Sequence, residues 1–413
     1  MHILCISLTG KKNQGARAIQ MAKVIRALQD QGAYVTVITR KNDKLTDFDR
    51  KAGRIICVDP SMEPESKPGS SSFLSKVAGG ILPQWEFTTR MAVKKALEVI
   101  DSDRPDCIFS SSNPVSSHFA GMKIAQISGL PWLASFSDPK PSTMLPPPYG
   151  SKLKRLIPKG YTPGLRKVLQ QCDAVHMPTR ICLQITEQYY NTSIAGKSFA
   201  IPPIGETNFN LKKQHAGNGY LVHLGSITKR LSGAFSQAVA RFAKDNPETF
   251  KGVIFVGKHH KKTDALIKKY GIESIVQTKP QVSHQEALDM ISKAGAVLIL
   301  EADMAFSHAL PSKFAEAAFS GTPILAVTPR KSAVRDYMKK YGGGFAAFHS
   351  GENILKGLNH IFTMNPEGFK QLREEQTRLA EEFSFKKIGD SYMEVFRHII
   401  DLQKAGTGNI AAR

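Results

Sequence analysis

Short apolar runs alternate with amphipathic stretches from the start of the chain. HILCISL at 2–8 is followed by a polar loop, and then by residues 16–31, where apolar positions recur every three or four residues. A second apolar run, AYVTVIT, follows at 33–39. A short continuous apolar run indicates a buried strand, and a 3.6-residue period indicates an amphipathic helix. The pattern therefore predicts a strand–helix–strand unit of a parallel sheet.

The alternation continues to about residue 205. A helix is predicted over 115–128, with Gly129 as its stop. Residues 60–90 are rich in Pro, Ser and Gly but carry several large apolar side chains. They fit a lid, a lipid-facing patch or a groove, and a short packed helix is the plain alternative. Further strands are predicted at 54–58, 106–111, 132–136, 174–177 and near 199–201.

The second half repeats the plan of the first. Residues 206–219 are polar and rich in Gly and Asn, which is typical of a linker. Helices are predicted at 232–244, 262–270 and 283–293. Strands are predicted at 220–224, 253–257, 274–278, 296–300 and 324–327. The sequence thus predicts an α/β protein with two doubly wound parallel-sheet domains.

The predicted boundaries follow from this pattern. Residues 1–205 form the first domain, 206–219 the linker and 220–385 the second domain. Residues 386–413 form a helix with one apolar face and a tail, and we expect them to pack back toward the first domain.

The charge is lopsided, with 56 Lys and Arg against 35 Asp and Glu, a net charge of +21. Such a field attracts nucleic acid, anionic lipid or phosphorylated small molecules. Seven basic residues and no acidic one lie between 140 and 172. This stretch suits an anionic membrane surface; nucleic acid competes but is not the expected partner, and a solvated basic face is the plain alternative. The candidate membrane or anion patch is Lys152, Lys154, Arg155 and Lys159.

The five cysteines form no CxxC pair. Cys5, Cys57 and Cys107 fall in strand-like runs, which predicts buried free thiols in a reducing compartment. The apolar run at the amino terminus is too short for a signal peptide, and no run approaches the ~18 apolar residues that span a bilayer. We therefore expect a cytoplasmic protein, at most peripheral on the inner face of the cell membrane.

The strand at 296–300 is followed by a polar loop and a helix that opens at Ser312. In open α/β sheets, ligands bind at the carboxyl ends of strands. Lys313 stands in the first helical turn, where the helix dipole disfavours a cation by roughly 0.3–1 kcal/mol unless an anion binds there. Glu316 shares its face. The pair suits a phosphate and a sugar hydroxyl, although a surface ion pair is an equally open interpretation.

Other strand ends carry candidate residues. In the loop after 220–224, Gly225 and Ser226 allow close backbone approach, while Lys229 and Arg230 supply charge for a diphosphate. Asp138 follows the strand at 132–136, where it is either a binding or catalytic carboxylate or a turn-capping residue. Asp101-Ser102-Asp103 has the D-x-D spacing of a metal motif but precedes a strand, so no metal site is predicted.

Together these segments resemble GT-B glycosyltransferases of the retaining family-4 type. LPSKFAEAAFSGTPILA at 310–326 resembles the "PSK-x-x-E-Y-x-x-x-G-x-P" element of that family, and HLGSITKR at 223–230 resembles its "GS-x-x-x-R" diphosphate loop. Residues 106–139 resemble its strand–helix–strand of the amino domain. The resemblance covers most of the chain. It implies two Rossmann-like domains facing a cleft, the first binding the acceptor and the second the nucleotide sugar.

The resemblance also implies roles for individual residues. Glu316 would hold the ribose, and the base would rest near Gln281 and Val282. The diphosphate would be held by Lys313, Arg230 and Lys229, with Ser312 capping it. Asp138 would lie near the reacting sugar carbon, with Gly15 and Asn113 on the acceptor side. The E-x7-E pattern of the family requires glutamate at position 308, and this chain has His308, which we place with Asp138 as a catalytic candidate.

The predicted function is transfer of a sugar from a UDP- or GDP-linked donor to a lipid-linked or polysaccharide acceptor. Lysine, arginine and backbone N–H groups can neutralise the departing diphosphate, so no cofactor or metal is expected. Retention of anomeric configuration is implied by the resemblance alone. The alternatives are a sugar-nucleotide epimerase of the same fold and a non-catalytic polyanion-binding protein.

Overall fold

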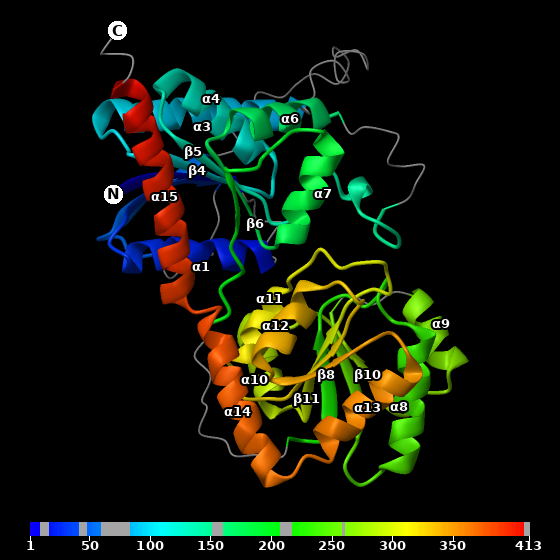
Figure 1. Ribbon diagram of the computed structural model, residues 1–413. Coiled ribbons are helices and arrows are strands. Elements are labelled where there is room, and N and C mark those ends of the chain that lie inside the picture. Colours follow the sequence, from blue (N-terminus) through cyan, green and yellow to red (C-terminus); the bar gives the residue numbers. More distant parts are fainter. Residues whose placement is uncertain are drawn as a thin grey trace. The chain divides into compact units, whose positions relative to one another are not determined.

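The computed structural model describes residues 1–8, 16–40, 48–58, 83–150, 160–206, 217–257 and 261–408 (Figure 1). Gly15 and the basic patch of Lys152, Lys154, Arg155 and Lys159 lie outside these ranges. The chain divides into two compact units, each described by itself. Unit 1 comprises Met1–Leu145, Gly150–Pro202 and Phe385–Arg413, and unit 2 comprises Pro146–Tyr149 and Pro203–Ser384.

Unit 1 is built on a seven-stranded parallel sheet in the order β3-β2-β1-β4-β5-β6-β7. The strands are β1 His2–Ser7, β2 Tyr34–Arg40, β3 Gly53–Val58, β4 Cys107–Ser111, β5 Trp132–Ser135, β6 Ala174–Met177 and β7 Ser198–Ala200. The helices are α1 Ala16–Asp30, α3 Pro83–Ser102, α4 Ser116–Ser128, α6 Thr162–Gln171, α7 Arg180–Tyr190 and α15 Phe385–Gly408, with a 3₁₀ turn at Ser142–Met144.

Unit 2 holds a six-stranded parallel sheet in the order β10-β9-β8-β11-β12-β13. The strands are β8 Tyr220–Leu224, β9 Gly252–Val256, β10 Val276–Lys279, β11 Ala296–Leu300, β12 Ile324–Val327 and β13 Gly344–Ala347. The helices are α8 Gly233–Asp245, α9 Lys261–Lys269, α10 His284–Lys293, α11 Ser312–Ala318, α12 Ala333–Tyr341, α13 Gly351–Phe362 and α14 Pro366–Glu381. The predicted fold class, two doubly wound parallel sheets, is confirmed.

Local chemistry explains where these helices begin and end. Side chains of Ser232, Ser283, Ser332 and Ser350 accept a hydrogen bond from the third residue of the helix that follows, which satisfies one of its unpaired N–H groups. At the other end of α4, Gly129 adopts the left-handed conformation that the sequence suggested, with φ of 68°.

The carboxyl-terminal helix α15 belongs to unit 1, although the segment before it belongs to unit 2. Its apolar face includes Ile388, Tyr392 and Phe396, all buried. The rings of Tyr392 and Phe396 lie edge-on to Phe109 of β4, with centroids 5.7 and 5.6 Å away. The last helix therefore completes the core of the first sheet, and Figure 1 shows it beside α1.

Unit 2 begins with a close approach of two backbones. Gly205 donates its N–H to the carbonyl of Phe383, and a Cβ at Gly205 would lie 2.3 Å from the carbonyl carbon of Ala315 in α11. Only glycine leaves room for this contact. Because α11 also carries Lys313 and Glu316, this packing helps to fix the helix of the candidate site.

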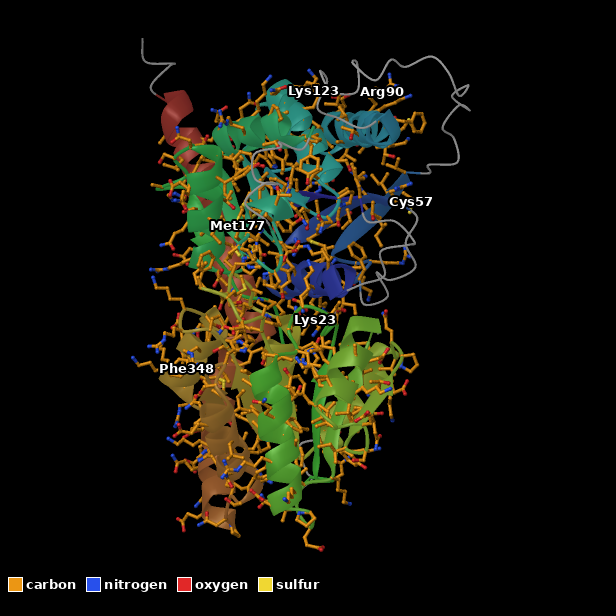
Figure 2. The ribbon with its side chains drawn as sticks, turned by 90° about the vertical axis from the view of Figure 1, so that its right-hand side faces the viewer. Lys23, Cys57, Arg90, Lys123, Met177 and Phe348 are labelled. Carbon is orange, nitrogen blue, oxygen red and sulfur yellow. The ribbon has the colours of Figure 1, made fainter. Side chains whose placement is uncertain are left out.

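Three expectations need correction or completion. Cys57 is exposed on the edge strand β3 rather than buried, because one flank of an edge strand lacks a neighbouring strand (Figure 2). Helix α3 begins at Pro83, inside the stretch left open between loop and helix. Strand β13 and helices α12 to α14 were not predicted; β13 reads GFAA and lacks the β-branched residues that mark strands.

None of the helices, as far as the chain is described, is long and apolar enough to cross a membrane. In each sheet the strand order reverses once, between β1 and β4 in unit 1 and between β8 and β11 in unit 2. Loops leaving the carboxyl ends of such a strand pair diverge and leave a crevice, the usual ligand site of open α/β sheets. Both reversal points carry predicted site residues.

Candidate functional site

The candidate donor site lies at the reversal point of unit 2. Strands β8 and β11 pair in parallel, so the loops after Leu224 and Leu300 leave the same edge of the sheet. The first loop carries Gly225, Ser226, Lys229 and Arg230, all at least partly exposed. The second loop leads to α11 and its Lys313–Glu316 pair. Segments about 80 residues apart in sequence are thus brought to one edge.

Lys313 and Glu316 form an ion pair with 2.8 Å between Nζ and Oε2. Glu316 is only 1% exposed, whereas the Lys313 side chain is 26% exposed. His284 Nε2, at the start of α10, lies 3.9 Å from the other carboxylate oxygen. A carboxylate this deeply buried is not a solvated surface charge, so the plain interpretation of a surface ion pair does not hold. The pair holds a cation at the rim of the sheet edge.

Tyr149 joins the two loops. It belongs to the four-residue segment Pro146–Tyr149, which packs with unit 2 although it lies in the first half of the sequence. Its hydroxyl accepts a hydrogen bond of 3.2 Å from Arg230 Nε, and Lys229 Nζ lies 5.4 Å from the centre of its ring. His308, 7% exposed, meets the same ring edge-on at 5.9 Å. The predicted diphosphate cations and His308 thus share one neighbour.

Glu301, the first residue after β11, is a buried carboxyl at 4% exposure. Its two oxygens accept hydrogen bonds of 2.6 Å from Ser307 Oγ and Ser332 Oγ. Burial raises the pKa of Glu301 to about 7, although both serines and the positive charges of Arg230 and Arg335 act to lower it. A buried carboxyl whose pKa is shifted toward neutrality is a common feature of functional sites, which makes Glu301 a candidate member of this one.

Arg335 on α12 supplies a fixed positive charge nearby. Its guanidinium donates to the carbonyls of Pro329, Ala346 and Ala347 at 3.2, 3.0 and 2.7 Å. It also lies 3.8 Å from the centre of the Phe348 ring, a cation–π contact; Figure 2 labels that ring in unit 2. These contacts hold the guanidinium against the ends of β12 and β13, so it acts as a structural charge.

The remaining predicted donor residues take different positions. Gln281 is exposed, and Val282 packs partly against the core of unit 2, just before the capping Ser283 of α10. Ser312 is half-buried at the first position of α11, directly after the N-cap residue Pro311.

Unit 1 gathers a second polar group at its own reversal point. Arg17, in the first turn of α1, donates to the carbonyl of Ser112 at 2.5 Å and to the hydroxyls of Ser111 and Ser135 at 2.5 and 3.3 Å. Burial lowers the pKa of Arg17, and the negative charge of the exposed Asp138 acts to raise it. Ser137 Oγ donates to Asp138 at 3.0 Å. Ser137 and Asp138 follow the carboxyl end of β5, and half-buried Asn113 follows β4.

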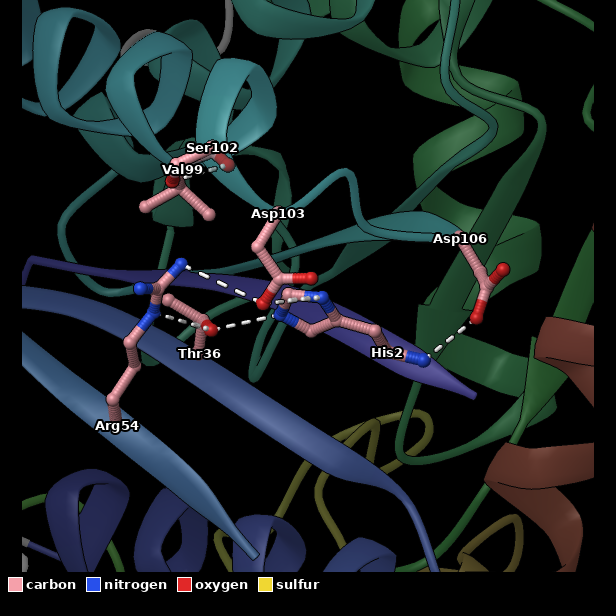
Figure 3. A network of polar contacts seen from close by, with 7 residues as sticks. All are labelled: His2, Thr36, Arg54, Val99, Ser102, Asp103 and Asp106. Carbon is pink, nitrogen blue, oxygen red and sulfur yellow. Dashed lines mark hydrogen bonds and ion pairs between the residues drawn. The ribbon is translucent and has the colours of Figure 1, made fainter.

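The discounted Asp101-Ser102-Asp103 motif has a structural role at the opposite end of β1 (Figure 3). Asp103 Oδ2 lies 3.6 Å from His2 Nδ1 and 3.8 Å from Arg54 Nη2. The other ring nitrogen of His2 meets Thr36 Oγ1 at 2.8 Å. Over the described ranges, no three His, Cys, Asp or Glu residues cluster as metal ligands do. The network ties together the amino ends of the first strands.

Sequence reasoning missed three members of the candidate site. Glu301 directly follows a buried strand, and the carboxyl end of a strand is where open α/β sheets bind ligands, so this position could have been predicted. Arg17 stands in the first turn of a helix, where the helix dipole disfavours a cation. The same argument singled out Lys313, so it could also have been applied to Arg17. Nothing in the sequence around Tyr149 marks it, because its place depends on the packing of a four-residue segment onto unit 2.

Comparisons with known proteins define the fold. The chain matches no protein-family model, and no curated protein matches it. Solved structures do match: sucrose-phosphate synthase from Thermosynechococcus elongatus has 16% identity and a TM-score of 0.67, with 97% of this chain and 99% of that chain covered. WaaG, a glycosyltransferase involved in lipopolysaccharide biosynthesis, has 13% identity and a TM-score of 0.61, with 96% and 99% covered.

A third structure carries a different activity. UDP-GlcNAc 2-epimerase from Neisseria meningitidis, bound to UDP-GlcNAc, has 14% identity and a TM-score of 0.54, with 96% of this chain and 100% of that chain covered. All three likenesses extend over nearly the whole chain. The two doubly wound units therefore have the fold of the GT-B glycosyltransferases, as the resemblance implied. At these identities the likeness defines the fold, and the chemistry has to be argued from the residues.

Proposed function

We propose that this protein is a glycosyltransferase that takes a sugar from a nucleotide-diphosphate donor. The observation that carries the proposal is the group of cations at the β8–β11 edge of unit 2. Lys229 and Arg230 adjoin one ring, that of Tyr149, and Lys313 is held by the buried Glu316. A departing nucleotide diphosphate accumulates negative charge, and prearranged cations stabilise that charge without reorganising.

Glu316 has a second proposed role as the acceptor of the ribose hydroxyls. One of its oxygens pairs with Lys313, and the other faces His284 at 3.9 Å. A carboxylate accepts several hydrogen bonds at once, so it can hold the lysine and receive a hydroxyl. Gln281 and Val282, which precede α10, are the proposed neighbours of the base, while Gly225, Ser226 and Ser312 are proposed to meet the phosphates.

We assign the acceptor to unit 1. Asp138 lies exposed after β5, Arg17 stands near it, and Asn113 follows the adjacent strand β4. A lipid-linked or polysaccharide acceptor fits the net charge of +21, which favours an anionic membrane surface. The proposal includes retention of anomeric configuration, with Asp138 and His308 as the groups nearest the reacting sugar.

The first test measures thermal stabilisation by UDP, GDP and ADP. At a ligand concentration about 100 times its dissociation constant, one of them should stabilise unit 2 by ~2.7 kcal/mol. Lys313→Ala and Glu316→Ala should abolish this increment, because each removes half of the buried pair. As matched controls, Lys95→Ala and Glu98→Ala break an exposed pair of the same 2.8 Å length in α3 and should retain it. Absence of stabilisation by every nucleotide would contradict the proposal.

A sugar-nucleotide epimerase is the second candidate, because the Neisseria meningitidis epimerase shares the fold over nearly the whole chain. The two activities differ in their need for an acceptor. Incubation with the bound nucleotide sugar alone, followed by NMR of the sugar protons, separates them. An altered sugar still linked to the nucleotide would favour the epimerase, whereas an unchanged donor that is consumed only with an added glycan or lipid-linked acceptor would favour the transferase.

A further inference from the structure

Glu301 is a buried carboxyl that the proposed donor site does not use directly. It follows β11 at the reversal point of the sheet, and its backbone N–H continues the ladder to β12 by donating to Val327 at 3.0 Å. At 4% exposure it is too enclosed to touch a substrate. Because Glu301 cannot contact a substrate itself, any effect on ligand binding has to pass through the polar and charged residues around it.

Two serines from different elements hold its oxygens. Ser307 lies in the loop that leads to His308 and α11, and Ser332 caps α12 by accepting the N–H of Arg335. Both hydroxyls donate to the carboxyl over 2.6 Å. The backbone N–H of Ser307 also donates to the carbonyl of Lys331 at 2.8 Å. Glu301 therefore fastens the loop before α11 to the start of α12.

The charges that act on Glu301 come from two further elements. The positive charges of Arg230, in the loop after β8, and of Arg335, in α12, both act to lower the pKa of Glu301. The Arg335 guanidinium donates to backbone carbonyls and contacts the Phe348 ring, and Arg230 Nε donates to the hydroxyl of Tyr149. Other titratable groups of this edge are Asp303, His308 and His349, together with Tyr149, Lys229, Lys313 and Glu316 of the candidate donor site. With Glu301 ionised, part of the Arg230 charge is already balanced before any ligand arrives.

We propose that Glu301 is a positioning residue whose carboxylate takes up a proton from solvent when a nucleotide sugar binds beside Arg230. This inference rests on the proposed function, since it requires a diphosphate at that edge. The diphosphate brings negative charge close to a buried carboxylate, and two like charges in a poorly solvated site repel strongly. Protonation of Glu301 removes this repulsion, so that the positive charge of Arg230 is balanced by the diphosphate alone.

The hydrogen bonds allow this change without rearrangement of the fold. In the ionised form both serine hydroxyls donate to the carboxylate. In the protonated form the carboxyl O–H can donate to one serine oxygen while the other serine continues to donate, since a hydroxyl both donates and accepts. The contact between the loop and α12 thus persists in both states, and only the charge changes.

The titration of Glu301 supports the geometry. Burial raises its pKa to about 7 in the free protein, so the carboxyl needs little further change to hold a proton at neutral pH. Binding of an anion raises the pKa again, and by linkage the affinity for that anion rises as pH falls through this range. If binding raises the pKa by about one, affinity at pH 6 should be about fivefold higher than at pH 8.

The test is isothermal titration calorimetry with UDP-glucose, or GDP-mannose where GDP is the nucleotide that stabilises the protein. Neither nucleotide sugar has a group that titrates between pH 6 and 8, unlike the free diphosphates. Repeating each titration in two buffers of different ionisation enthalpy gives the number of protons taken up. We expect uptake of a fraction of a proton near pH 7 in the native protein, and uptake smaller by that fraction in Glu301→Gln, with affinity less dependent on pH.

Two further variants keep the inference falsifiable. Glu375→Gln alters a partly buried carboxylate that accepts the Gly343 N–H at 2.8 Å near the other end of the strands, and it should leave the uptake unchanged. Ser307→Ala removes a hydrogen bond that favours the ionised Glu301, so the pH of greatest uptake should move upward; this variant decides the matter if Glu301→Gln does not fold. Native-like uptake in Glu301→Gln, or an unmoved profile in Ser307→Ala, would overturn the inference, whereas absent binding by the native protein would overturn the proposed function.

Discussion

At the scale of single residues, burial separates two ion pairs that look alike in sequence. Lys95–Glu98 and Lys313–Glu316 are both three residues apart on a helix, and both have 2.8 Å between nitrogen and oxygen. The side chains of the first pair are 38% and 47% exposed, while Glu316 has 2% of its side chain exposed. Water screens the first pair, so only the second holds its cation in a defined place.

A double-mutant cycle should measure this difference. For Lys313→Met and Glu316→Gln we expect a coupling energy of about 1–3 kcal/mol, because either single change leaves a buried group without its partner. The same cycle on Lys95 and Glu98 should give about 0.5 kcal/mol or less. Urea unfolding of the four variants of each set provides the values. Equal coupling in the two pairs would show that burial does not distinguish them.

At the scale of elements, unit 1 depends on a helix from the far end of the chain. The apolar face of α15 covers β4 and β6, where Tyr392 and Phe396 meet Phe109 and the hydroxyl of Tyr392 lies 3.2 Å from His176 Nδ1. The face was visible in the sequence as a period of three to four apolar positions. The sequence also led us to expect packing toward the first domain, but not which strands the helix covers, because a helical stripe does not specify its partners.

Phe396→Ala should therefore destabilise unit 1. The side chain is fully buried, and removal of a buried phenylalanine costs about 3–5 kcal/mol. Both tryptophans of the chain, Trp85 and Trp132, belong to unit 1, so fluorescence during urea unfolding reports on this unit. Leu402→Ala on the same helix is the control, since Leu402 is 57% exposed and its loss should change stability by about 0.5 kcal/mol or less. Equal effects of the two changes would contradict the assigned packing.

At the scale of the whole molecule, buried titratable groups make the two units differ in their response to acid. In unit 1, burial lowers the pKa of His118 and of His176 to about 3. In unit 2, burial lowers the pKa of His223 to about 4 and raises that of Glu301 to about 7. On acidification from pH 7 to about 4.5, the histidine favours the unfolded state and the glutamate favours the folded state, so their effects oppose each other in unit 2.

Unit 1 should accordingly lose stability first. Its unfolded state binds protons on His118 and His176 below about pH 6.5, while the folded state binds none until about pH 3. Stability therefore falls as pH falls through this window, by about 3 kcal/mol between pH 6.5 and 5. Urea unfolding followed by tryptophan fluorescence at several pH values measures it, and His118→Gln should remove about half of the slope. A slope unchanged by this substitution would refute the assignment.

Much of the fold could be predicted because it depends on local periods. Strands such as 220–224 and 324–327 coincide with the predicted runs, since parallel strands are buried on both faces and read as apolar runs. Strand β13 was not predicted, and Cys57 was wrongly predicted to be buried. In both cases packing, rather than local composition, decides whether the segment forms a strand or the side chain is buried.

The same distinction between local preferences and tertiary packing applies to the candidate site. The residues of the sequence by themselves determined the two sheets and the loops at their reversal points, because strand, helix and turn preferences act over a few neighbours. Only the tertiary structure decided that Glu316 is buried, that Tyr149 meets Arg230 and His308, and that Glu301 joins Ser307 to Ser332. Burial and the alignment of distant loops arise when the whole chain packs, and those two effects set the charge of the site.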